Sequence, residues 1–151
     1  MSVLSLFAGV CAFFSAAMIG LWIKKRLLKK AVFYQGYYDY LLFATEKIGY
    51  ERMPIGELNA NFLKKNAGIF PDYLAGRGET PPLSDATLAE IKEYLSGIGR
   101  TDAETQIASL RAKCAEIKRF VEGECVKYRK EGAMYFKLCA LLGVVVFIIL
   151  V

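Results

Sequence analysis

Hydrophobic stretches without charges lie near both ends of the chain. Residues 3–23 are 21 consecutive uncharged positions, and residues 138–151 are 14 more. A helix rises 1.5 Å per residue, so about 20 apolar residues cross a bilayer core of roughly 30 Å. The second stretch reaches 19 residues, 133–151, when Lys137 extends to the membrane surface. The pattern predicts transmembrane helices at 1–23 and 133–151 and a middle domain at 24–132.

Helical spacing continues beyond the first hydrophobic stretch. In residues 31–48 the apolar side chains recur at intervals of three and four, as in one face of a helix. Gly49 is expected to end this helix. Pro54 is expected in the first turn of a second helix, which ends near 66–68. The Gly- and Pro-rich residues 68–86 predict a loop with one helical turn at 71–74, followed by a third helix from 84 or 85 to 95.

A long helix is predicted from the sequence TDAE at 101–104. This is a capping box, in which the Thr101 hydroxyl accepts from the Glu104 N–H, and the helix should run at least to Lys130. Gly132 is the one interruption before the last hydrophobic stretch, but a single glycine costs about 1 kcal/mol and need not end a helix, so the helix is expected to run nearly unbroken into the membrane. The apolar seam has a 4-3-4-3-4 spacing: Ala103, Ile107, Leu110, Cys114, Ile117 and Val121. It indicates either the packing face of an antiparallel bundle or a self-associating coiled coil.

These elements define the fold class. The chain lacks alternating β-branched runs and Asn-Gly turns, so strand signals are weak throughout. The sequence predicts an all-α protein, a small antiparallel helical bundle flanked by N- and C-terminal transmembrane helices.

The positive charge is concentrated beside the hydrophobic stretches. The net charge is +5, but residues 31–126 hold 11 basic and 14 acidic side chains, a net of −3. Basic residues next to a span tend to face the cytoplasm and contact anionic lipid. We therefore expect a cytoplasmic middle domain that favours a basic partner, and no nucleic-acid binding. The lipid-facing cluster beside the first span is Lys24, Lys25, Arg26, Lys29 and Lys30.

Small residues recur every fourth position in the first span. Ala8, Ala12, Ala16 and Gly20 share one helix face, which allows another helix to approach closely. The C-terminal span, with Ala140 and Gly143, is the expected partner. An alternative is a homo-oligomer that forms a pore through this face, although neither span has an ionisable residue at mid-depth. A cleaved signal peptide at the N-terminus is a further alternative.

Composition argues against an enzyme. The chain has no histidine, which removes the common nucleophile–base catalytic sets and most zinc sites. Its four cysteines include no CxxC pair and are interpreted as reduced structural residues. We expect no cofactor and no metal. The close carboxylate pairs are interpreted as solvated helix faces or a cap: Glu90/Glu93, Asp102/Glu104 and Glu122/Glu124.

Two segments of the middle domain carry a family resemblance. The segment IGYERMPI at 48–55 has an aliphatic residue, a tyrosine two positions later, and then Pro and an aliphatic residue. The segment IGRTDAETQ at 98–106 fits the pattern aliphatic-Gly-x-x-Asp-x-x-x-Gln. With the basic stretch after the first span and the apolar tail, they resemble the stage III sporulation protein AB family of endospore-forming bacteria.

The resemblance implies a function. Members of this family belong to the channel complex that joins the mother cell and the forespore. Their soluble domain is similar to the cytoplasmic domain of the platform protein of type II secretion and type IV pilus machines. The implied role is a membrane platform that couples a cytoplasmic ATPase, the stage III sporulation protein AA, to other membrane proteins of the complex.

Candidate contact residues follow from the second segment. Arg100, Asp102 and Gln106 are the residues expected to contact a partner, although Asp102 also suits a first helical turn and Gln106 an internal hydrogen bond. Arg52 and Arg100 are candidates for binding an acidic partner. Tyr50 and Pro54 are interpreted as a corner between helices rather than as a site.

Overall fold

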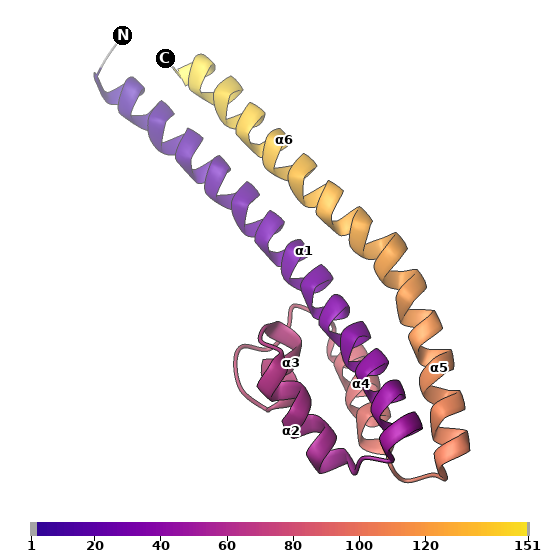
Figure 1. The fold of residues 1–151 in the computed structure, drawn as a ribbon. Coiled ribbons are helices and arrows are strands. Elements are labelled where there is room, and N and C mark those ends of the chain that lie inside the picture. Colours follow the sequence, from indigo (N-terminus) through magenta and orange to yellow (C-terminus); the bar gives the residue numbers. More distant parts are fainter. Residues whose placement is uncertain (1–2, 151) are drawn as a thin grey trace. The chain divides into compact units, whose positions relative to one another are not determined.

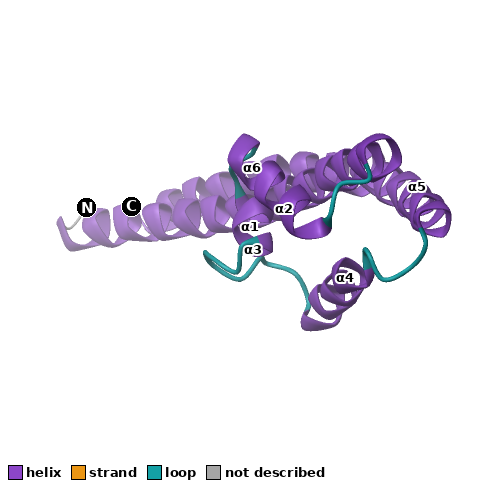
Figure 2. Ribbon diagram, turned by 60° about the horizontal axis from the view of Figure 1, so that its bottom comes forward, coloured by secondary structure: helices purple, strands orange, loops and turns teal. Residues whose placement is uncertain are grey.

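The computed structural model describes residues 3–150, and they confirm the all-α class. The helices in chain order are α1 (Val3–Glu51), α2 (Ile55–Lys65), α3 (Ile69–Leu74), α4 (Asp85–Gly97), α5 (Ala103–Phe120) and α6 (Val126–Leu150), with a π-helical turn, η1 (Val121–Cys125), between the last two. Loops connect α1 through α5, the longest of them at residues 75–84 between α3 and α4, and no strand occurs within 3–150 (Figure 2).

The chain divides into two compact units. The helix pair consists of the described residues up to Leu28 and those from Val126 onward, and the helical domain is Lys29–Cys125. Both α1 and the α5–η1–α6 segment are helical across this division. The predicted membrane boundaries, after residue 23 and before residue 133, lie within the helix pair and stay predictions.

In the helix pair, the first part of α1 lies antiparallel beside α6 (Figure 1). The register follows from the glycines. A Cβ placed on Gly20 would lie 2.9 Å from the Cys139 Cβ, and one on Gly143 would lie 3.3 Å from the Ala16 Cβ. Every buried residue among the described side chains of this pair is glycine, at positions 9, 20, 132 and 143. The two backbones therefore approach through glycine, as in close membrane helix contacts.

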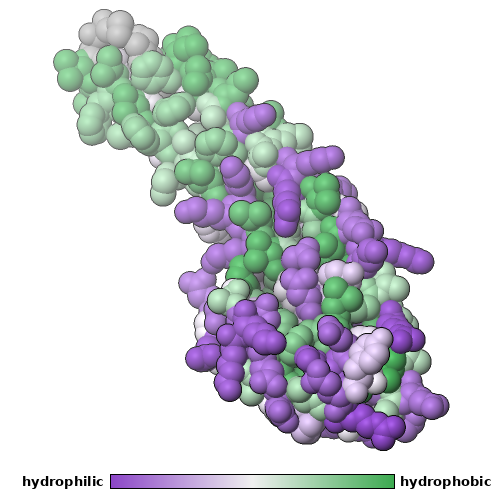
Figure 3. Space-filling view, viewed as in Figure 1, coloured by the Kyte–Doolittle hydropathy of each residue, from purple (hydrophilic) through white to green (hydrophobic). Residues whose placement is uncertain are grey.

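The face of the helix pair seen in Figure 3 is apolar toward the chain ends. In each helix, only 11% of the most hydrophobic 18-residue stretch is buried. Both helices are long and apolar enough to cross a membrane. Lys137 is exposed, and its neighbours Phe136 and Cys139 face Gly20. Lys137 is therefore near the level of Gly20, which lies four residues before Lys24. At 1.5 Å per residue, the Lys137 ammonium would need to extend about 6 Å along the helix axis to reach the level of Lys24.

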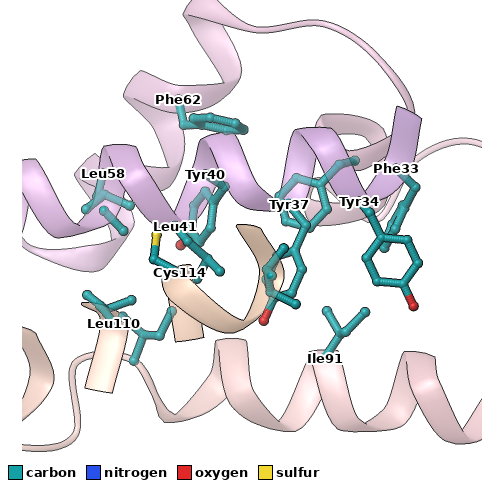
Figure 4. Close-up of a cluster of buried hydrophobic side chains, with 14 of the residues drawn as sticks. Phe33, Tyr34, Tyr37, Tyr40, Leu41, Leu58, Phe62, Ile91, Leu110 and Cys114 are labelled. Carbon is teal, nitrogen blue, oxygen red and sulfur yellow. The ribbon is translucent and has the colours of Figure 1, made fainter. Parts of the chain in front are cut away.

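The helical domain has an aromatic core built on α1. Its side chains at intervals of three and four are buried, and Figure 4 shows Phe62 on one side of α1 and Ile91 and Leu110 on the other. The Phe70 ring centroid lies 5.4 Å from those of both Phe33 and Tyr37. A Cβ on Gly36 would come within 2.7 Å of the Phe70 Cβ. Gly36 thus makes room for α3.

Two helix boundaries near the α1–α2 connection differ from the predictions. The helix α1 continues through Gly49 to Glu51, and Arg52 has a φ of 47°. The Met53 N–H donates to the Lys47 carbonyl at 3.5 Å across this turn. Pro54 is the residue before α2, not part of its first turn. Glycine commonly occupies the left-handed position after a helix, but here Arg52 occupies it. The predicted helix end at Gly49 was therefore wrong.

The long C-terminal helix is continuous at Gly132, as expected, but it has an unexpected irregular turn before that residue. Its irregular turn lies at 121–125 and includes Gly123, while Gly132 is inside α6 and faces the backbone of Lys24. The predicted seam is buried at Leu110, Cys114 and Ile117 against the domain core. Ala103, its first member, is exposed. The seam therefore packs within one chain.

Candidate functional site

The connection between α4 and α5 is a tight corner held by Gln106. The Gln106 side chain is 5% exposed, and its Oε1 accepts from the Gly99 N–H at 2.9 Å and from the Thr101 hydroxyl at 3.1 Å. Gly99 has a φ of 88°, a backbone conformation that residues with a Cβ rarely adopt. The Gly-x-x-Asp-x-x-x-Gln pattern thus encodes the corner itself.

Asp102, not Thr101, caps α5. The Asp102 carboxylate accepts from the Thr105 N–H at 3.0 Å, and this bond holds the pKa of Asp102 below its usual value. Thr101 instead donates its hydroxyl proton to Gln106. The prediction of a Thr101–Glu104 capping box was therefore wrong by one residue.

The two segments that carried the resemblance lie together. A Cβ on Gly99 would lie 2.6 Å from the Ile55 Cδ1, so the α4–α5 corner packs on the start of α2. The α1–α2 and α4–α5 connections lie at the same end of the helical domain (Figure 1). A groove of about 640 Å³ runs between them. We call it the corner groove, lined by Ile48, Arg52, Met53, Pro54, Ile55, Ser96, Ile98, Gly99, Arg100, Thr101, Ala103 and Gln106.

The charged lining of the corner groove has one sign. Arg52 and Arg100 are both exposed, and the lining contains no carboxylate. The nearest acidic residues in sequence are engaged elsewhere, because Glu51 forms an ion pair with Lys47 and Asp102 caps α5. The buried residues of the lining are Ile48, Ile98 and Gln106. The groove can therefore bind apolar side chains beside an anionic group.

The three predicted contact residues have different environments in the structure. Gln106 is buried and Asp102 caps a helix, so both have internal roles. Arg100 is exposed at the groove. Contact of any of them with a partner stays a prediction. The groove was not predictable, because it depends on the approach of residues about 45 positions apart in the sequence. No sequence pattern indicated the left-handed conformation of Arg52.

Two of the basic residues after the first apolar segment lie near aromatic rings. The Lys24 Nζ lies 5.6 Å from the centroid of the Phe136 ring, and the Arg26 guanidinium lies 5.3 Å from that of Trp22. Lys25 is exposed, and Lys29 pairs with Glu79 at 3.0 Å. Aromatic and basic side chains together are typical of a membrane–water interface.

The predicted small-residue stripe is only partly at the helix contact. Gly20 is buried and Ala12 and Ala16 are half-buried, whereas Ala8 is exposed. Gly9, next to Ala8, is buried in its place. Residues spaced by four turn gradually around a helix that has 3.6 residues per turn, so the stripe moves out of the helix contact at Ala8.

A second cleft, of about 690 Å³, lies beside α4 and α5. The Lys113 Nζ in its lining pairs with Glu90 at 3.4 Å and Glu116 at 3.0 Å. Tyr37 also lines it, and its buried hydroxyl has no hydrogen-bond partner among the described residues. With two acidic and two basic side chains, the lining has no net charge and indicates no particular ligand.

The carboxylate pairs named above do not form a recognisable centre. Glu122 lies 3.8 Å from Lys118 as an ion pair on the helix surface, and Glu90 pairs with Lys113. Among residues 3–150, no three His, Cys, Asp or Glu side chains gather as a metal site would require.

Comparisons with known proteins agree with the resemblance. No curated protein and no solved structure matches the chain significantly. A family model, stage III sporulation protein AB, matches residues 68–151, which include the corner motif at 98–106, α5 and α6. This match covers more than half of the chain, and the chain belongs to the stage III sporulation protein AB family.

Proposed function

We propose that this protein is a non-enzymatic membrane platform of the sporulation channel complex. Its two apolar helices anchor the helical domain at the cytoplasmic, mother-cell side. The domain couples the stage III sporulation ATPase, protein AA, to the membrane proteins of the complex. The observation that carries the proposal is the antiparallel pairing of the two apolar helical segments that flank the helical domain in the sequence, in a chain of this family.

The charge distribution supports the proposed sidedness. Lys24, Lys25 and Arg26 follow the first apolar segment, and Lys127, Arg129 and Lys130 precede the second. Both groups lie on the side of the intervening domain in the sequence. Basic residues near the ends of spans favour the cytoplasmic side and anionic lipid, so the domain should face the cytoplasm.

The internal contacts favour an anchor over the alternative pore. Gly20 and Ala16 face α6 of the same chain, which leaves less of this small-residue face for self-association. The non-enzymatic part of the proposal is supported by a sequence without histidine and by the structural roles of Asp102 and Gln106.

The test is a clean deletion in the endospore-forming host, followed by microscopy of sporulating cells. We expect engulfment to finish and forespores then to shrink and fail to mature, with rescue by the intact gene. A sporulation-neutral deletion would contradict the proposal. A large homo-oligomer of the purified chain in detergent would favour the pore.

A further inference from the structure

We propose that the corner groove is a docking surface for an acidic, partly apolar segment of a partner protein. The inference rests on the proposed platform function and names the surface and the chemistry of its partner. It stands on three features of the helical domain: the shape of the groove, the sign of its charge and the conformation of Arg52.

The groove is large enough to accept side chains of a partner. Its volume of about 640 Å³ is within the range of roughly 300–1,000 Å³ found for ligand pockets. Aliphatic side chains from both connections line it: Ile48 and Ile55 flank the α1–α2 connection, and Ile98 belongs to the α4–α5 connection. Tyr50, on the last turn of α1 and two residues before Arg52, is 88% exposed. Aromatic residues and arginine are enriched in protein contact surfaces.

The charge of the groove differs from that of its surroundings. Residues 31–126 carry a net charge of −3, yet the groove lining has two arginines and no acidic side chain. Arginine presents five donors in a planar fork that matches a carboxylate. A partner attracted here would thus carry acidic residues, although the domain as a whole favours a basic partner.

The position of Arg52 indicates a role for its side chain. A non-glycine residue at positive φ costs roughly 1–2 kcal/mol, and glycine or asparagine avoids most of that cost. Arginine at this site is locally unfavourable, and its side chain makes no hydrogen bond or ion pair that would offset the cost within the domain. Strain of this kind is common where a side chain is kept for binding.

The test uses the full chain in a neutral detergent and two short fluorescent peptides. Both peptides have the same leucine stripe at helical spacing, and their polar faces are all Glu in one and all Lys in the other. We expect saturable binding of the Glu peptide, measured by fluorescence anisotropy, and weaker binding of the Lys peptide. The Arg52→Gln/Arg100→Gln variant should bind the Glu peptide about tenfold more weakly, the effect of losing two exposed ion pairs.

A matched control changes the net charge equally. The variant Arg77→Gln/Arg111→Gln removes two exposed arginines outside the groove and should bind the Glu peptide as the parent does. A second variant, Arg52→Gly/Arg100→Gln, removes the same groove charges with a residue that suits the left-handed turn. It should lose binding as the Gln pair does, even if the Gln pair alters the loop.

Several results would overturn the proposal. They are the absence of saturable binding of the Glu peptide, equal binding of both peptides, and equal weakening by the groove and control variants. Binding of anionic vesicles that is lost only in the groove variants would assign the groove to lipid instead. Because these measurements use purified protein, their failure leaves the deletion phenotype, and with it the proposed platform function, untouched.

Discussion

Two buried tyrosines on α1 provide a matched pair for a stability test. Tyr37 and Tyr40 are 0% and 1% exposed and lie three residues apart, both in the core of the helical domain (Figure 4). The Tyr40 hydroxyl lies 2.7 Å from the Asn59 Oδ1 and donates to it. The Tyr37 hydroxyl has no partner among the described residues. Removing the two hydroxyls should therefore change stability in opposite directions.

The magnitudes follow from the two environments. Tyr40→Phe loses a hydrogen bond and leaves the Asn59 oxygen without its donor, which costs about 1–2 kcal/mol. Tyr37→Phe removes a hydroxyl that is buried without compensation, which should stabilise the domain by about 1 kcal/mol. The two variants should differ by at least about 2 kcal/mol, roughly a 30-fold change in the unfolding equilibrium.

Ionisation does not complicate the comparison. Burial raises the pKa of Tyr40 to about 12 and that of Tyr37 further above its ordinary value, with a smaller contribution from neighbouring Tyr94, Glu116 and Glu90. Both side chains are therefore neutral near pH 7, and the variants compare hydroxyl groups only.

The assay is urea unfolding of the full chain in a mild neutral detergent, followed by far-UV circular dichroism. A shift in midpoint at constant slope reports a change in stability alone. If Tyr37→Phe destabilises the protein as much as Tyr40→Phe does, the Tyr37 hydroxyl has a partner such as a buried water, and the reasoning is refuted.

Two further predictions concern the α4–α5 corner. Gln106→Leu leaves the Gly99 N–H and the Thr101 hydroxyl without their acceptor, so amides at 97–101 should exchange hydrogen about 30-fold faster, an opening cost reduced by about 2 kcal/mol. Mass spectrometry of that peptide checks this, with α1 core peptides as the internal control, and unchanged exchange would contradict it. Asp102 has a lowered pKa, so its stabilising contribution is present above its unfolded value of 3.8 and is lost as the pH falls through the lower folded value. Asp102→Asn keeps a capping side chain and should remove this acid-dependent loss, which urea midpoints between neutral pH and the acid range would detect; equal acid sensitivity of both proteins would argue against the cap.

Local sequence patterns were sufficient to predict where the helices of the middle domain lie. The periodicity of residues 31–48 predicted the buried face of α1, because a helix repeats its environment every three to four residues. The turn at 71–74 and the helix beginning at 85 were also predicted, and α3 and α4 lie there. Exact ends were less predictable. Both Thr101 and Asp102 are good caps by composition, and only the acceptor geometry of Gln106 decides between them.

By itself, the sequence determined the all-α class, the two apolar segments, the boundary charges and the family motifs. The tertiary structure alone decided what those motifs do together. The contact of Gly99 with Ile55 and the single-sign corner groove arise where the α4–α5 connection meets the start of α2, which is distant in sequence. Such features depend on packing between elements rather than on neighbours in the chain, and a pattern read along one helix contains no information about them.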